Sequence, residues 1–238
     1  MNILLLGYGK MGKVIEQIAF GRGHQIVGKI DISNRHELAY FSKQTVDVAI
    51  EFSAPEAAYQ NLKWSLAQGI PTVCGTTGWL EHLPEINDIC ATNDTAFFYA
   101  SNYSIGVNLF FKLNKHLAKL IAPYNQYNVS TTEIHHTEKK DAPSGTAITL
   151  AEGLIELLPN KTEWVNRAES TENQIPIVSL REGTVPGTHV VCYDSVVDSI
   201  EIRHVAHSRE GFAVGAVVAA EWLKDRKGTF GMDDLIGQ

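Results

Sequence analysis

The chain has 238 residues, 44% of them hydrophobic and 20% charged, which is typical of a globular protein with one large or two modest domains. Its formal net charge of −7 argues against general nucleic-acid binding, which needs a basic surface. No basic leader precedes an apolar run, no run approaches the ~20 residues that cross a bilayer, and the three cysteines are isolated, so we expect a cytoplasmic protein without a membrane partner.

The chain begins with the pattern of a dinucleotide-binding unit. An apolar run at residues 2–6 ends in a G-x-G-x-x-G turn, and residues 13–20 have the apolar spacing of a helix. A second strand at 25–30 ends at an aspartate, where an acidic residue typically accepts hydrogen bonds from the adenosine ribose. The alternative is a glycine turn that binds no nucleotide. The predicted cofactor-binding residues here are Gly7, Tyr8, Gly9, Lys10, Met11, Gly12 and Asp31.

The residues around Asp31 bear on the choice between NADH and NADPH. Ile32 follows it rather than an arginine, which removes the obvious partner for a 2′-phosphate and mildly favours NADH. Lys29 and Arg35 are close in the sequence, however, so both cofactors remain open.

Alternating strands and helices continue through the first hundred residues. Strands are predicted at 46–50, 71–74 and 95–99, and a helix at 55–67. This is the pattern of an α/β, Rossmann-type doubly wound parallel sheet, whose ligand lies at the carboxyl ends of the strands. One strand end carries small residues and hydroxyls, Gly75, Thr76 and Thr77, which let the backbone come near a ligand or form a plain turn.

The second half reads as a separate α+β domain with a mixed sheet. Its predicted elements are a helix at 109–120, a strand at 127–134, a helix at 147–158, an irregular polar stretch at 164–177, two adjacent β-type runs at 189–193 and 199–205, a final helix at 211–224 and a tail at 228–238. The expected domains are residues 1–104 for dinucleotide binding and 105–210 for the substrate.

The run from Glu133 to Ala147 carries the predicted chemistry. It is a strand end, a loop with His135, His136 and Lys139, and a helix start that either Asp141 or Ser144 can cap. The histidines can transfer protons near neutral pH. The backbone amides at the helix start are expected to be unpaired and to favour a bound carboxylate or phosphate; they belong to Ser144, Gly145 and Thr146. The alternative is a surface loop with a helix cap.

A metal site is not expected. His189, His204 and His207 form no H-E-x-x-H motif, and the sequence has no carboxylate cluster at ligand spacing. Arg203 and Arg209 can contact a carboxylate, but a solvated or paired role is the better interpretation.

The run 133–147 resembles the signature of the dihydrodipicolinate reductase family, E-x-H-H-x-x-K-x-D-A-P-S-G-T-A, at every specified position. The G-T-T-G at 75–78, the N-Y-S-I-G-V-N at 102–108 and the R-x-G-x-x-x-G-x-H at 181–189 are similar to family segments as well. The chain departs in being shorter than many members and in a glycine turn one residue tighter than their G-x-x-G-x-M-G.

The resemblance implies reduction of 4-hydroxy-tetrahydrodipicolinate, a cyclic dicarboxylate, to tetrahydrodipicolinate with NADH or NADPH, in lysine and diaminopimelate biosynthesis. It implies that His135 donates the proton, that Lys139 is a second donor, and that His136 and the amides of Gly145 and Thr146 hold carboxylates. It also implies that the nicotinamide site is edged by Gly75, Thr76, Thr77, Ala100, Ser101, Asn102 and Tyr103. It further implies that residues 211–238 pack back onto the nucleotide domain and that the second domain builds a homotetramer.

Two alternatives remain at this point. Another two-domain nicotinamide dehydrogenase, of the aspartate or homoserine type, would share the first hundred residues but lack the block at 135–146. A non-catalytic nucleotide sensor would need no proton donor beside an anion site.

Overall fold

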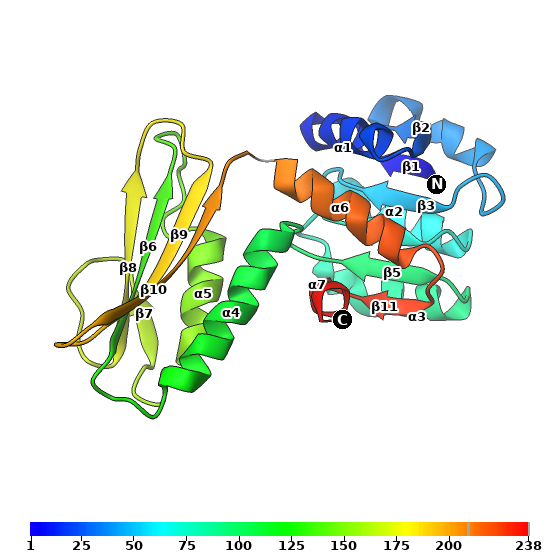
Figure 1. Ribbon diagram of the computed structural model, residues 1–238. Coiled ribbons are helices and arrows are strands. Elements are labelled where there is room, and N and C mark those ends of the chain that lie inside the picture. The colour runs from blue at the N-terminus through cyan, green and yellow to red at the C-terminus, as the bar shows by residue number, and fades with distance from the viewer. Residues whose placement is uncertain (209, 238) are drawn as a thin grey trace. The chain divides into compact units, whose positions relative to one another are not determined.

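The computed structural model describes residues 1–208 and 210–237, and these residues form two compact units (Figure 1). The first unit comprises Met1–Ile105 and the chain from Glu210 onward. The second unit begins at Gly106 and takes up the chain between. Arg209 and Gln238, which figured in the predictions, lie outside the described residues.

The first unit is built on a parallel sheet. Its strands are β1 (Asn2–Leu6), β2 (Gln25–Ile30), β3 (Val48–Glu51), β4 (Thr72–Cys74), β5 (Ala96–Tyr99) and β11 (Gly228–Phe230). They lie in the order β11-β5-β4-β3-β1-β2, and every neighbouring pair is parallel. The predicted doubly wound parallel sheet is confirmed, with its change of winding direction between β1 and β3.

Helices cover both faces of this sheet (Figure 1). The helical elements of the first unit are α1 (Lys10–Gly21), the 3₁₀ segments η1 (Ile32–Tyr40) and η2 (Leu80–His82), α2 (Pro55–Ala67), α3 (Leu83–Thr92), α6 (Glu210–Leu223) and α7 (Met232–Ile236). Ile3 and Leu5 pack in one core with α1 and α6, whereas Leu4 and Leu6 face the other side. Consecutive side chains of β1 therefore serve opposite layers, which explains its unbroken apolar sequence.

The end of the chain corrects one prediction. Residues 228–238 were expected to form a plain tail, but Gly228–Phe230 pairs with β5 as an edge strand, and α7 follows. The helix before it packs very closely: a Cβ on Gly215 would lie 1.7 Å from the carbonyl oxygen of Tyr103. This glycine therefore sets how near α6 approaches the chain that leaves β5.

The second unit has a mixed sheet with helices on one face. Its elements are α4 (Ile105–Ile121), β6 (Asn128–His135), α5 (Gly145–Ile155), β7 (Glu163–Val165), β8 (Gln174–Arg181), β9 (Gly187–Asp194) and β10 (Ser199–Ala206). The strand order is β10-β9-β6-β8-β7, antiparallel from β10 to β6 and parallel from β6 to β7. The predicted mixed sheet, with 189–193 beside 199–205, is confirmed.

The stretch at 164–177 was predicted to be less regular, which is correct for residues 166–173 and wrong at its two ends. It contains most of β7 and the start of β8, where Ile175 and Ile177 are buried on either side of Pro176. The proline and the shortness of β7 conceal the alternation from a reading of the sequence. No helix among the described residues is both long enough and apolar enough to span a membrane.

Candidate active site

The glycine turn after β1 is fixed by close backbone approaches. Gly7 has φ +99°, and a Cβ there would lie 2.3 Å from the carbonyl oxygen of Phe52. A Cβ on Gly12 would lie 2.4 Å from the carbonyl oxygen of Gly7, whereas one on Gly9 would meet nothing within 4 Å. The first and third glycines thus close the turn, and the second leaves open space at the start of α1, where helix amides favour an anion.

A cavity of about 270 Å³ lies in the first unit at the ends of β3 and β4. It is lined by Met11, Phe52, Ser53, Pro55, Gly75, Thr76 and Thr77. The backbone N–H of Ser53 donates to Oγ1 of Thr76 at 2.9 Å, which joins the two loops. The structure therefore brings four predicted cofactor residues, Met11, Gly75, Thr76 and Thr77, to one cavity.

Below this cavity lies a buried carboxylate that the sequence analysis missed. Glu51 ends β3 and is fully buried, and it accepts hydrogen bonds from Ser53, from the amide of Asn61 and from the thiol of Cys74. Burial, followed by the neighbouring Glu51 charge, raises the pKa of Cys74 well above its usual range. Cys74 is therefore an unreactive part of the support beneath the two loops.

The residues after β5 play unequal parts. The side chain of Tyr103 is buried, and its hydroxyl donates to the carbonyl oxygen of Cys74 at 2.7 Å, so it braces the end of β4. Ala100 is also nearly buried, whereas Ser101 is exposed. Oδ1 of Asn102 accepts from the N–H of Ser104. Only the polar residues of this segment present side chains at the surface.

Asp31 is exposed just beyond β2, where its Oδ1 accepts from the N–H of Ile32 at 2.8 Å. The two nearby cations have other partners. Nζ of Lys29 lies 2.6 Å from Glu16 and 4.7 Å from the ring centre of Tyr8, and Arg35 donates to Asn61 at 2.7 Å. Both cations are therefore already engaged, and a phosphate would have to compete with these partners.

In the second unit, strand register gathers four polar side chains at the end of β6. Glu133 lies opposite His189 of β9, and His135 lies opposite Arg181 of β8. Paired residues of adjacent strands project to the same face, so all four meet beneath α5. Glu133, His135 and His189 are buried, with relative exposures of 0%, 8% and 5%.

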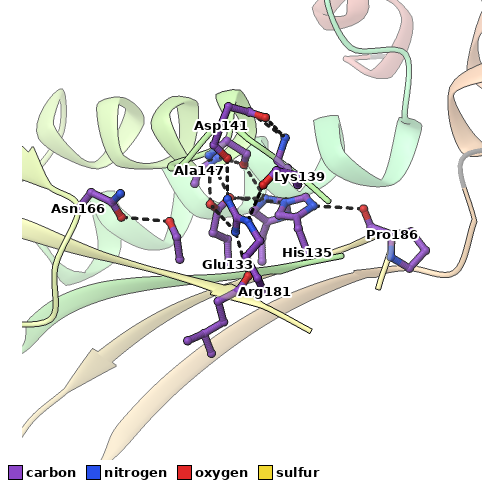
Figure 2. A network of polar contacts seen from close by, with 12 residues as sticks. Glu133, His135, Lys139, Asp141, Ala147, Asn166, Arg181 and Pro186 are labelled. Carbon is purple, nitrogen blue, oxygen red and sulfur yellow. Dashed lines mark hydrogen bonds and ion pairs between the residues drawn. The ribbon is translucent and has the colours of Figure 1, made fainter. Parts of the chain in front are cut away.

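Glu133 is the centre of this group (Figure 2). Its two oxygens accept from the backbone N–H of Ser144 at 3.1 Å each, and its Oε1 lies 3.6 Å from Nη1 of Arg181. Oε2 lies 3.4 Å from Nε2 of His135. Burial opposes ionisation, but His135 and Ser144 outweigh it and hold the pKa of Glu133 well below its usual range. The residue is a buried carboxylate anion.

His135 and His136 occupy different environments. His135 is the last residue of β6, and its Nδ1–H donates to the carbonyl oxygen of Pro186 at 3.2 Å. His136 lies beyond the strand, where it lines a cavity of about 390 Å³ with Thr137, Glu138, Gly183, Thr184 and Pro186. The first imidazole is enclosed, and the second faces open space.

The start of α5 corrects one expectation and settles another. Ser144 is the N-cap, with its Oγ accepting from the N–H of Ala147 at 3.2 Å, whereas Asp141 does not cap the helix. The expectation that the Ser144 amide is unpaired is wrong, because it donates to Glu133. Gly145 and Thr146 follow in the first turn, whose amides have no partner within the helix.

Lys139 and Arg181 organise the loop between β6 and α5 (Figure 2). Nζ of Lys139 donates to both carboxylate oxygens of Asp141 at 2.8 Å. Arg181 donates to the carbonyl oxygens of Lys139 and Asp141, at 3.2 and 2.6 Å. The guanidinium thus fixes the backbone that carries the lysine, a role the sequence analysis did not assign.

His189 is a neutral neighbour of this group. Its Nε2 lies 3.2 Å from Oγ of Ser144 and 3.8 Å from Glu133. Burial, with repulsion from His135, lowers the pKa of His189 to about 4. The imidazole is therefore uncharged near neutral pH.

Glu133, His135 and His189 offer three ligand atoms within 4.8 Å of one another, a spacing that can hold a metal ion. The sequence did not indicate this group, because cross-strand pairing of β6 with β9 assembles it and local spacing does not. Arg181 and the Ser144 amide already balance the carboxylate, however, and a cation there would be repelled by the guanidinium. The R-x-G-x-x-x-G-x-H segment was the sequence signal that pointed here.

Comparisons with known proteins follow the same two halves of the chain. The model described as dihydrodipicolinate reductase, N-terminus, matches residues 1–103, and that described as dihydrodipicolinate reductase, C-terminus, matches residues 106–236. A 4-hydroxy-tetrahydrodipicolinate reductase of Christiangramia forsetii is 51% identical over 99% of this chain and 98% of its own. One from Methanosarcina acetivorans is 36% identical over 100% and 99%. The dipicolinate-bound dihydrodipicolinate reductase from Paenisporosarcina sp. TG-14 has a similar fold, with a TM-score of 0.77 at 23% identity, covering 99% of this chain and 100% of that one.

Proposed function

Because the chain belongs to the dihydrodipicolinate reductase family over nearly its whole length, we propose that it reduces 4-hydroxy-tetrahydrodipicolinate to tetrahydrodipicolinate in lysine and diaminopimelate biosynthesis. The observation on which this function rests is that an enclosed histidine, His135, and the start of α5 with its backbone amides lie in the same small region. That region offers a proton source and a place for a carboxylate within a few residues of each other.

The first unit suits a nicotinamide cofactor. The open space at Gly9 and the cavity lined by Met11, Gly75, Thr76 and Thr77 can take the pyrophosphate and the nicotinamide end, with Asp31 on the adenosine ribose. When bound, the reduced nicotinamide supplies the hydride. NADH is favoured over NADPH, because Lys29 and Arg35 already have partners beside an acidic residue that would repel a 2′-phosphate.

The second unit supplies the remaining chemistry. His135 donates the proton that balances the hydride, and Lys139 provides positive charge and a second donor as water leaves the hydroxylated ring. The amides of Gly145 and Thr146 hold one substrate carboxylate at the start of α5, beside the hydroxyl of Ser144, and His136 holds the other. The substrate class is a small cyclic dicarboxylate, like the dipicolinate bound to the related reductase from Paenisporosarcina sp. TG-14.

Further properties belong to the same proposal. We propose a reaction without a metal, since the carboxylate of the candidate ligand Glu133 already pairs with His135 and Arg181. We propose a cytoplasmic location, which suits three unpaired cysteines. The family resemblance supports a homotetramer built through the second-unit sheet.

The test follows the loss of NADH or NADPH absorbance with purified protein. Three reactions are compared: 4-hydroxy-tetrahydrodipicolinate, aspartate semialdehyde, and no added substrate, each before and after dialysis against EDTA. The proposal expects oxidation only with the first substrate, a lower KM for NADH than for NADPH, and no effect of EDTA. Turnover of aspartate semialdehyde would favour another dehydrogenase, and cofactor binding without any turnover would favour a nucleotide sensor.

A further inference from the structure

Glu133 is a buried charge that the proposed reaction does not use. It has no exposed surface, and its ionised state is maintained by an amide, a guanidinium and an imidazole around it. Burying a charged carboxylate costs several kcal/mol in lost hydration. Its contacts with neighbouring groups must offset this cost.

Its position joins the two parts of the substrate site. On one side, both oxygens receive the amide of Ser144, the N-cap of α5. On the other side, Oε2 lies 3.4 Å from Nε2 of His135, a buried nitrogen that makes no hydrogen bond of its own to the described residues. One carboxylate therefore touches both the proton donor and the first residue of the helix start.

The imidazole of His135 is also held from the side away from Glu133. The carbonyl oxygen of Pro186 accepts its Nδ1–H, and the next residue lies close to the ring. A Cβ on Gly187 would lie 3.0 Å from Cε1 and 3.4 Å from Nδ1 of His135. Only a glycine leaves this room without moving the ring.

We propose that Glu133 is a positioning residue that acts through His135, holding the imidazole between itself and the Pro186-Gly187 backbone. The carboxylate lies 3.4 Å from one ring nitrogen and the Pro186 carbonyl oxygen 3.2 Å from the other, so together they fix the orientation of the ring. The inference rests on the proposed role of His135 as proton donor. It extends the site to Gly187 and to a carboxylate that touches no substrate.

The charge of Glu133 has the opposite effect on substrate binding. It lies beneath the amides of α5, where a negative charge competes with a substrate carboxylate for the positive end of the helix. Removing the charge should therefore impair turnover without weakening the binding of a dicarboxylate. A residue needed only for folding would lose both together.

The experiment compares Glu133→Gln with the unchanged protein and with Glu152→Gln, which removes an exposed carboxylate from α5. We measure kcat with NADH and the affinity for dipicolinate by calorimetry. Expected for Glu133→Gln is a kcat lower by about 10- to 100-fold, part of the 10²–10⁴ that general acid catalysis supplies, with dipicolinate affinity equal or tighter. Glu152→Gln should match the unchanged protein in both.

A second variant keeps the inference testable if Glu133→Gln does not fold. Gly187→Ala leaves Glu133 in place but pushes the ring of His135 away, and Gly21→Ala, whose methyl meets nothing within 4 Å, is its control. The expectation is again a lower kcat with retained dipicolinate affinity.

The outcomes separate the inference from the proposed function. If the unchanged protein does not turn over 4-hydroxy-tetrahydrodipicolinate, the function itself is wrong. If it does, full kcat in a folded Glu133→Gln, or parallel loss of kcat and dipicolinate affinity, overturns the positioning role. Where only Gly187→Ala folds, its full kcat overturns it.

Discussion

The two ring nitrogens of His135 meet a backbone carbonyl and a carboxylate, so the residue is enclosed rather than displayed. Lys139, by contrast, is partly exposed and tied to Asp141. The two proposed donors thus differ in freedom: the lysine can exchange its partner for a substrate oxygen, whereas the imidazole has a fixed place.

Replacing either donor should affect chemistry more than cofactor binding. We expect His135→Ala and Lys139→Ala to lower kcat by about 100-fold or more, the order of losing general acid help. NADH affinity, measured by fluorescence titration, should not change, because its proposed site lies in the other unit. Lys140→Ala, an exposed neighbour, is the control for kcat. Near-normal kcat in both variants would remove the two residues from the mechanism.

The buried neutral His189 predicts a dependence of stability on pH. Its pKa is about 4 in the folded protein and about 6.5 unfolded, so between these values the unfolded chain binds the extra proton. The free energy of unfolding therefore falls as pH drops from 6.5 towards 4. The carboxylate of Glu133, whose pKa is also lowered, loses its own contribution only below about 4.5.

Urea unfolding at pH 7 and at pH 5 measures the contribution of His189 to the free energy of unfolding. Over that interval the unchanged protein should lose about 2 kcal/mol more than His189→Gln, from 1.5 pH units at 1.36 kcal/mol each. Equal losses in the two proteins would mean that His189 titrates normally when folded.

At the scale of elements, α6 offers a test in which two effects of opposite sign compete. Glycine to alanine within a helix gains up to about 1 kcal/mol in propensity. At Gly211 the added methyl would meet only a side-chain atom at 3.8 Å, but at Gly215 it would meet the Tyr103 carbonyl at 1.7 Å. A backbone atom cannot give way as a side chain can, so overpacking prevails at the second position.

We expect Gly215→Ala to destabilise the first unit by at least about 2 kcal/mol, or to prevent folding, and Gly211→Ala to be neutral or stabilising. Thermal unfolding of both variants measures the difference. A Gly215→Ala protein as stable as its partner variant would show that α6 packs less closely than described.

The elements that the sequence predicted are those with their own apolar pattern. In the strands of the first unit and in helices such as α2, that pattern lies within one continuous stretch of the chain. β7 and β11 have three residues each, and both are strands only because β8 and β5 lie beside them. Such pairing depends on segments far along the chain, which local composition does not record.

The site divides in the same way. His135, Lys139 and the cap at Ser144 lie within one run of the chain, and their chemistry could be inferred there. Arg181 and His189 come more than thirty residues later, and only the registers of β8 and β9 against β6 bring them to Glu133. Whether the Ser144 amide is free depends on that carboxylate, which is why the prediction of an unpaired amide was wrong.

At the scale of the molecule, the open face of the second-unit sheet bears on assembly. Along β6 the residues that face away from α5 are half-buried, and Leu180 and Val205 of β8 and β10 are 39% and 41% exposed. These apolar side chains lie on the sheet through which we propose that the tetramer forms. Light scattering should then give four times the chain mass of 26.2 kDa.

Val205→Glu places a charge on that face and should yield smaller species that remain folded. Val197→Glu, in the exposed turn before β10, is the matched control and should stay tetrameric. A monomer at micromolar concentration in the unchanged protein would contradict the proposal.

The place of α6 and β11 in the first sheet has a consequence for synthesis on the ribosome. Ala216 and Ala220 of α6 are core residues of a helix that packs on β3, β4 and β5, and β11 completes the edge of the sheet. The unit whose strands emerge first thus lacks part of its core until the last thirty or so residues have been translated, whereas the second unit has all its strands before that point. Domains made of continuous chain can fold during translation, so the later-made unit should be the earlier to fold, leaving the nucleotide-binding half as a client for chaperones.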